Sequence, residues 1–151
     1  MPTDFRRFLM ICTGNICRSP MAEYYMRGRL PEGGEWQVAS MGLGALVGHP
    51  ADDKAIAVMA EKGIDLGPHR ARQFDADAAK DFDLLLTMEA GQAEWIGWRH
   101  PFLRGRVQPL GHWTGRDVPD PYRQPEVAFI EARERVIEGV DSWLERLLPG
   151  N

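Results

Sequence analysis

The sequence predicts an α/β fold in a single domain over residues 1–151, with an open parallel sheet of four strands and helices on both faces. A continuous apolar run at 8–12 is typical of a strand buried on both sides, and the mostly apolar run at 84–88, which contains Thr87, is interpreted as another buried strand. Segments with the helical spacing of apolar residues alternate with the strands, and this alternation favours parallel pairing. A chain of 151 residues has the length of one compact domain with one core.

The elements can be assigned in order along the chain. The first strand, at 8–12, stops at a Gly-containing segment, 13–18, that suits a turn. Ser19 and Pro20 then open a helix, with Ser19 as N-cap and Glu23 in the first turn. The other strands are expected at 36–39, 84–88 and 107–110, the last edge-like because of Pro109. The other helices are expected at 52–62, ended by Gly63, at 89–98 and, after a loop over 111–124, at 125–148.

Composition narrows the function classes. The net charge is −4, so no global basic surface predicts binding to nucleic acid or to an anionic membrane. No apolar stretch approaches the roughly 18 residues of a membrane span, which favours a cytoplasmic protein without membrane insertion. The two cysteines, Cys12 and Cys17, are too few and too close for a secreted disulfide framework or a zinc site. No metal or other cofactor is expected.

The segment after the first strand has the composition of an anion site. In a parallel sheet, ligands bind beyond the carboxyl ends of the strands, and a helix that starts there offers unpaired N–H groups and a favourable dipole. Cys12 is the candidate nucleophile, because positive surroundings at a helix start favour a cysteine thiolate. Arg18 offers a planar fork for two phosphoryl oxygens, and Ser19 can hydrogen-bond the sulfur. Gly14 lets the backbone approach the phosphate, and Asn15 tolerates a left-handed conformation.

Simpler or different interpretations exist for this segment. A buried strand-end cysteine and an ordinary helix cap would explain Cys12 and Ser19 separately, but the whole string Cys-Thr-Gly-Asn-Ile-Cys-Arg-Ser-Pro favours phosphoryl transfer. The chain has no G-x-x-x-x-G-K-[ST] sequence. In the glycine-rich segment 42–48, Val47 stands where a dinucleotide fingerprint needs its third glycine. Segment 42–48 is therefore expected to be a close-packed loop.

These residues resemble the signature of the low-molecular-weight protein tyrosine phosphatases, which is a Cys, five residues, an Arg and a Ser near the N-terminus, with an Asp-Pro far downstream. Residues 12–19 and Asp120-Pro121 match it, and the similarity covers almost the whole chain. The resemblance implies that Cys12 is the nucleophile, Arg18 binds phosphate, and Asp120 is general acid and then base. Asp117, which no proline follows, is expected to be a solvated loop residue.

The resemblance also implies a loop and its supports. The phosphate-binding loop would comprise Thr13, Gly14, Asn15, Ile16, Cys17 and Ser19 beside the catalytic pair. Ser40 and His69 stand where the family ties the loop Asn in place, so His69 is interpreted as structural rather than catalytic.

Several stretches, 42–48, 84–89, 111–113 and 119–123, look like the bacterial branch linked to tyrosine autokinases of exopolysaccharide export. That branch lacks a bulky Trp in the pocket wall, and Leu43 or Leu46 is expected to replace it, with Leu43 preferred. Tyr122 is the expected facing wall for a phenyl phosphate. The expected partner is a phosphotyrosine protein, with a bacterial tyrosine autokinase as the candidate, and the default oligomeric state is a monomer.

Other functions share parts of this pattern. An arginine phosphatase has Thr after the loop Asn and Phe after Asp-Pro, where this chain has Ile16 and Tyr122, which suit a phenyl ring. An arsenate reductase needs resolving cysteines downstream, and none follows Cys17. A non-catalytic phosphopeptide-binding module is a further alternative, and the presence of Cys12, Arg18, Ser19 and Asp120 together argues against it. Cys17 is either a small buried loop residue or a thiol that traps an oxidised Cys12 as a disulfide, and both interpretations stay open.

Overall fold

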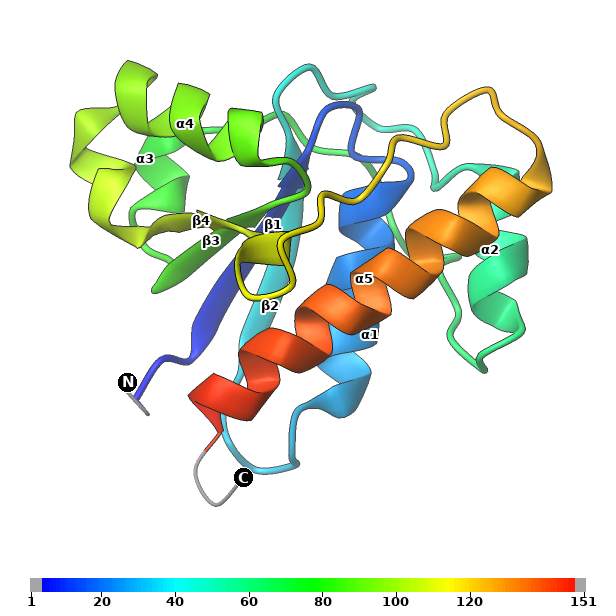
Figure 1. The fold of residues 1–151 in the computed structure, drawn as a ribbon, viewed down its shortest axis with the longest axis horizontal. Coiled ribbons are helices and arrows are strands. Elements are labelled where there is room, and N and C mark those ends of the chain that lie inside the picture. The colour runs from blue at the N-terminus through cyan, green and yellow to red at the C-terminus, as the bar shows by residue number, and fades with distance from the viewer. Residues whose placement is uncertain (1–3, 149–151) are drawn as a thin grey trace.

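The computed structural model describes residues 4–148 and contains one parallel sheet covered by helices (Figure 1). Its strands are β1 (Arg7–Cys12), β2 (Gln37–Gly42), β3 (Leu84–Thr87) and β4 (Val107–Pro109), in the order β2-β1-β3-β4. The helices are α1 (Arg18–Arg29), α2 (Asp53–Ala60), α3 (Ala76–Ala79), α4 (Ala90–Arg99) and α5 (Glu126–Leu147), with 3₁₀ turns at Pro101–Arg106 and Leu110–His112. Helices α1 and α5 lie on one face and α3 and α4 on the other (Figure 1). The predicted fold class is confirmed.

The central strand, β1, divides the core into two layers. Phe8, Met10 and Cys12 belong to the cluster that α1, α2 and α5 cover, whereas Leu9 and Ile11 belong to the cluster under α3 and α4. All five side chains are almost completely buried. Burial on both faces explains why the run has no polar alternation, since neither face of β1 meets solvent.

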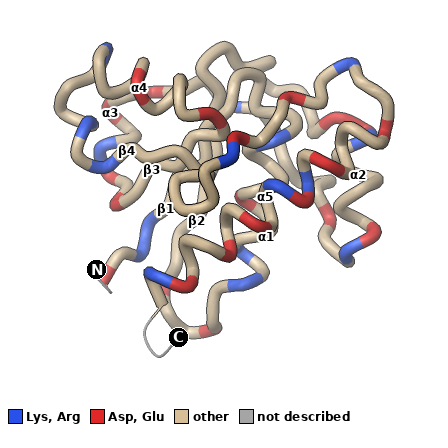
Figure 2. Tube along the Cα trace, viewed as in Figure 1, with Lys and Arg blue, Asp and Glu red and all other residues tan. Residues whose placement is uncertain are grey.

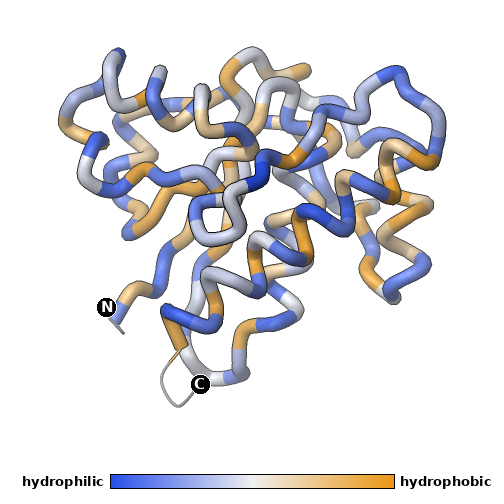
Figure 3. The backbone as a smooth tube through the Cα atoms, in the orientation of Figure 1, coloured by the Kyte–Doolittle hydropathy of each residue, from blue (hydrophilic) through white to orange (hydrophobic). Residues whose placement is uncertain are grey.

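Helix α5 covers the sheet through one apolar stripe. Phe129, Val136, Val140 and Trp143 are buried at helical spacing, and the indole N–H of Trp143 donates to the carbonyl of Leu110 (3.0 Å). Hydrophobic and hydrophilic positions recur in turn along the helix (Figure 3), and acidic and basic residues are interspersed on it (Figure 2). The outer face of α5 is therefore a mixed-charge surface. Within residues 4–148, no helix combines the length and the apolar character needed to cross a membrane.

Two elements differ from the expectation. Helix α1 begins at Arg18 with Cys17 as N-cap, so Ser19 lies inside the first turn and is not the cap. Its hydroxyl instead accepts from Nδ2 of Asn15 (2.8 Å) and lies 2.9 Å from Sγ of Cys12, in the loop that follows β1. The short helix α3 was not expected, because four residues are too few to show a 3.6-residue period. Asp75 caps it by accepting from the N–H of Asp77 (3.0 Å).

Gly42, the last residue of β2, packs against the loop that follows β1. A Cβ built on Gly42 would lie 2.5 Å from the carbonyl oxygen of Thr13 and 2.9 Å from the Cβ of Asn15. We expect Gly42→Ala to lower the free energy of unfolding by about 2 kcal/mol, measured by urea denaturation, because the backbone of the loop must shift. Gly44→Ala is the matched control, since nothing lies within 4 Å of its Cβ position. Equal losses in both variants would contradict the argument.

Candidate active site

The site lies at the carboxyl end of β1, where the chain turns through residues 13–17 into α1. A second segment, the loop between Leu110–His112 and α5, is brought to the same edge because the N–H of Val118 donates to the carbonyl of Met88 (2.9 Å), just after β3. This docking carries Asp120 and Tyr122 to the loop after β1. Residues more than 100 positions apart in the sequence therefore share one pocket.

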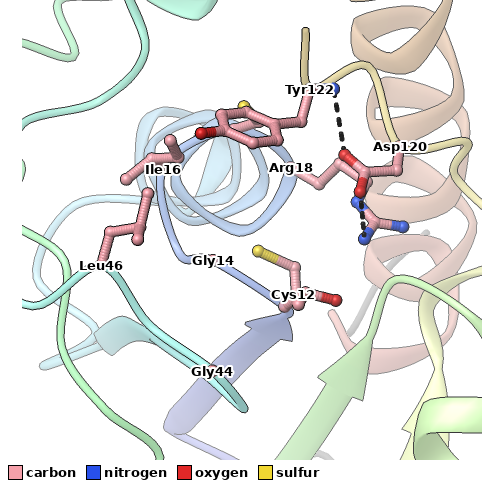
Figure 4. Close-up of a pocket in the computed structure, with 10 residues that line it drawn as sticks. Cys12, Gly14, Ile16, Arg18, Gly44, Leu46, Asp120 and Tyr122 are labelled. Carbon is pink, nitrogen blue, oxygen red and sulfur yellow. Dashed lines mark hydrogen bonds and ion pairs between the residues drawn. The ribbon is translucent and has the colours of Figure 1, made fainter.

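The pocket has a volume of about 160 Å³. Figure 4 shows the thiol of Cys12 directed into the space beside Ile16, Leu46 and Tyr122, with Arg18 and Asp120 at the other side. Its lining brings together eight of the residues that the sequence predicted for the site: Cys12, Thr13, Gly14, Ile16, Cys17, Arg18, Asp120 and Tyr122. Leu46, the alternative to Leu43, and Gly44, which was not predicted, complete the lining.

The structure places Leu46, and not the preferred Leu43, in the wall of the pocket. Leu43 does not line the pocket and packs against the core cluster under α3 and α4, whereas Leu46 lines it. The cause is the hydrogen bonding of the loop after β2. The N–H of Leu43 continues the pairing with β1 by donating to the carbonyl of Cys12 (2.9 Å), and the N–H of Leu46 donates to the carbonyl of Gly14 (3.1 Å). Leu46 is thereby the leucine placed beside the loop that holds the thiol.

The backbone of the loop is arranged for an anion. Every carbonyl from Cys12 to Cys17 accepts a hydrogen bond from a surrounding segment, with donors at Leu43, Gly44, Leu46, His69, Asp52 and Met21. The N–H groups of Gly14 and Ile16, by contrast, donate to no acceptor among residues 4–148. A loop whose carbonyls are all engaged while N–H groups stay available, and which leads into a helix start, favours a bound oxyanion.

Asn15, within this loop, hydrogen-bonds to residues from the surrounding segments. It adopts a left-handed conformation (φ 60°) and is fully buried. Its Nδ2 donates to the hydroxyls of Ser19 (2.8 Å) and Ser40 (2.9 Å), and its Oδ1 accepts from the N–H of Arg72 (2.8 Å). Its carbonyl oxygen lies 2.6 Å from Nε2 of His69, which carries the proton because a carbonyl only accepts. Burial lowers the pKa of His69, which favours the neutral ring.

The two thiols have different surroundings. The Sγ of Cys12 lies 2.9 Å from the hydroxyl oxygen of Ser19 and accepts from the N–H of Asn15 (3.3 Å). Both contacts can stabilise a thiolate. Burial raises the pKa of Cys17, and the nearby Asp52 acts in the same direction, so Cys17 stays protonated. Of the two thiols, Cys12 is therefore the one whose sulfur is contacted by the Ser19 hydroxyl and the Asn15 N–H inside the pocket.

Arg18 is held by partners from three segments. Its Nη1 donates to Oε2 of Glu89 (2.5 Å) and to the carbonyl of Val118 (2.9 Å), and its Nη2 lies 3.7 Å from Oδ2 of Asp120. The side chain is 2% exposed. Glu89, which precedes α4, was not among the residues predicted for the site. An acidic residue directly after a buried strand at this edge was the only signal available.

We expect Glu89→Gln to lower kcat/KM for an aryl phosphate about fivefold, because the guanidinium loses its charged anchor while the shape of the residue is kept. The inhibition constant of inorganic phosphate should rise by a similar factor. Asp117→Asn is the matched control, since the Asp117 side chain, from the downstream loop, also contacts the start of α4 but accepts from the N–H of Ala90 (2.9 Å) and not from Arg18. Equal effects of the two substitutions would contradict an anchoring role for Glu89.

The downstream loop presents one carboxylate to the pocket. Asp120 has a half-exposed side chain, and its Oδ1 accepts from the N–H of Tyr122 (3.1 Å). Asp117 is an exposed loop residue, as expected, and its Oδ1 also accepts from the N–H of Ala90 at the start of α4 (2.9 Å). Within residues 4–148, no group of three or more His, Cys, Asp or Glu side chains is placed to share a metal ion.

Comparisons with known proteins agree with this geometry. The family described as "Low molecular weight phosphotyrosine protein phosphatase" matches residues 7–149. The chain is 44% identical to a probable low molecular weight protein-tyrosine-phosphatase, EpsP of Ralstonia nicotianae, over 94% of this chain and 96% of that protein. Wzb of Vibrio vulnificus, solved in complex with benzylphosphonate, has a TM-score of 0.88 and 37% identity, covering 95% of this chain and 99% of that one.

A third relative has a different activity in its name. The YwlE arginine phosphatase from Geobacillus stearothermophilus has a TM-score of 0.85 and 31% identity, covering 95% of this chain and 92% of that one. The fold is thus common to both activities, and the higher identity lies with the tyrosine phosphatases. The chain belongs to the low molecular weight phosphotyrosine protein phosphatase family, and it is an enzyme that acts on phosphoproteins.

Proposed function

We propose that Cys12 is the nucleophile of this phosphatase, Arg18 the phosphate clamp and Asp120 the general acid and base. The observation that supports this is the direction of the Cys12 thiol into a pocket closed by Arg18 and Asp120. The Cys12 thiolate attacks phosphorus, so an S–P bond forms while the P–O bond to the leaving group breaks. Asp120 gives its proton to the leaving oxygen, and Arg18 with the loop N–H groups neutralises the phosphoryl oxygens.

The second half of the reaction uses the same groups. The Asp120 carboxylate takes a proton from water as the water oxygen attacks the phosphocysteine, and the S–P bond breaks to release phosphate and the thiolate. The Ser19 hydroxyl, 2.9 Å from Sγ, can donate to the sulfur as it leaves. No redox partner or cofactor is needed to balance either half.

The preferred group is phosphotyrosine. Ile16, Leu46 and Tyr122 provide apolar and aromatic surface for a phenyl ring, and none of them offers an acid to a guanidinium. The benzylphosphonate complex of the Vibrio relative supports the same ring-plus-phosphoryl chemistry. We infer that the protein substrate is a bacterial tyrosine autokinase of exopolysaccharide export. The phosphatase acts on it in the cytoplasm. Similarity to the relatives named EpsP and Wzb supports that partner.

The first test compares kcat/KM for the phosphotyrosine and phosphoarginine versions of one peptide. The second test compares a phosphorylated autokinase with generic phosphotyrosine peptides as substrates. We expect kcat/KM for phosphotyrosine to exceed that for phosphoarginine by at least about 100-fold, because a hydrophobic pocket must desolvate the guanidinium. A preference for phosphoarginine would overturn the substrate assignment. An autokinase hydrolysed no faster than generic phosphotyrosine peptides would overturn the partner while leaving the chemistry intact.

A further inference from the structure

Arg123, which follows Tyr122 at the pocket mouth, has an unusual backbone conformation. Its φ is 63°, in the left-handed region that non-glycine residues rarely adopt. It is the third residue of a turn that the N–H of Gln124 closes by donating to the carbonyl of Pro121 (2.8 Å). A turn with positive φ only at its third residue normally has Gly or Asn there. An arginine at this position carries a backbone cost that glycine would not carry.

The side chain of Arg123 lies beside the aromatic wall of the pocket. Its guanidinium carbon is 5.2 Å from the centre of the Tyr122 ring, within the range of a cation–π contact. Arg123 is exposed and has no ion pair with any carboxylate of residues 4–148. Arg116, in the same loop, is by contrast paired with both carboxylate oxygens of Glu138 (2.8 and 2.6 Å). Arg123 therefore carries a free positive charge next to a residue that lines the substrate pocket.

The mouth of the pocket is asymmetric as a result. On one side, Leu46 lines the pocket and the adjacent Val47 is 66% exposed, which gives an apolar rim. On the other side, Tyr122 and Arg123 give an aromatic and cationic rim. A peptide whose phosphotyrosine enters the pocket must place its neighbouring residues over these two rims.

We propose that Arg123 binds an anionic group next to the phosphotyrosine, so that the enzyme selects phosphotyrosines with acidic neighbours. This inference rests on the proposed function of the pocket. The anion is an Asp or Glu carboxylate or a second phosphoryl group, both of which match the planar fork of a guanidinium. Because the chain has a net charge of −4, a local cation is needed to favour an acidic segment at the mouth. Arg123 takes no part in the transfer of the phosphoryl group and determines specificity only.

The test uses p-nitrophenyl phosphate and three phosphotyrosine peptides that differ only in their neighbours: uncharged residues, Asp residues or a second phosphotyrosine. We expect the parent to favour the two anionic peptides about fivefold in kcat/KM, and this preference to weaken with added salt. Arg123→Ala and Arg123→Gly should lose the preference, and Arg123→Lys should keep part of it. Lys80→Ala removes one positive charge beside α3, away from the pocket, and should keep all of it.

The glycine variant separates recognition from folding. Because glycine adopts the left-handed conformation without strain, Arg123→Gly should melt at the same or a higher temperature than the parent. If the parent and Arg123→Ala show the same preference for the anionic peptides, the inference is overturned. It is also overturned if a stably folded Arg123→Gly loses kcat/KM by the same factor on all four substrates. If these variants lose the preference for only one of the two anionic peptides, that peptide identifies the anion that Arg123 binds. A parent without activity on any substrate would instead overturn the proposed function.

Discussion

Cys12→Ser is expected to reduce turnover of aryl phosphates by more than about 10⁴-fold while leaving the fold intact. The serine hydroxyl occupies nearly the same volume, and the surrounding donors from Ser19 and Asn15 stay in place. The hydroxyl is not ionised near neutral pH, and a phosphoserine in this cradle would not be released as readily as a phosphocysteine. Steady-state kinetics and a thermal melt of the same sample would separate loss of chemistry from loss of structure.

The matching control replaces the other thiol. Cys17→Ser should still form the covalent phosphoenzyme, detectable by mass spectrometry after rapid acid quenching, because the attacking sulfur is intact. Cys12→Ser should show no such adduct yet still bind inorganic phosphate, since Arg18 and the loop N–H groups remain. Residual turnover of Cys12→Ser near that of the parent, or an adduct located on Cys17, would remove Cys12 from the central role.

The local part of this site could be predicted because one short segment contains it. Strand, loop and helix start are contiguous from residue 8 to residue 29, so a cysteine at the strand end and an arginine at the helix start necessarily lie around one turn. The left-handed Asn15 follows from the same local chemistry. A buried central strand also appears directly as an apolar run, since no face of it meets water.

Contacts between distant segments could not be predicted in the same way. Glu89 reaches Arg18 across 71 residues because β1 and β3 pair in the sheet. Asp117 reaches the first N–H of α4 across 27 residues because the downstream loop docks at Met88. The choice between Leu43 and Leu46 likewise depended on which N–H groups continue the pairing after β2. Periodicity and spacing describe one segment at a time, and none of these contacts leaves a periodic trace in the sequence.

Asp120→Asn is expected to lower the rate by an amount that depends on the leaving group. Phenolate leaves poorly without a proton, so hydrolysis of phenyl phosphate should fall about 10²- to 10³-fold. p-Nitrophenolate is stable as an anion, so hydrolysis of p-nitrophenyl phosphate should fall only about tenfold. The variant keeps the size of the side chain and its acceptor for the N–H of Tyr122, so the loop should keep its conformation. Measuring kcat for a series of substituted phenyl phosphates gives the dependence directly.

A steeper dependence on leaving-group acidity in Asp120→Asn than in the parent is the signature of a missing general acid. A purely structural role for Asp120, through its 3.7 Å approach to Arg18, would instead lower the rates of all the substrates by one common factor. Asp117→Asn makes the same chemical change in the same loop, at a carboxylate that accepts from the N–H of Ala90 in α4, and it should leave the dependence as in the parent. If Asp117→Asn steepened the dependence and Asp120→Asn did not, the proton donor would be Asp117.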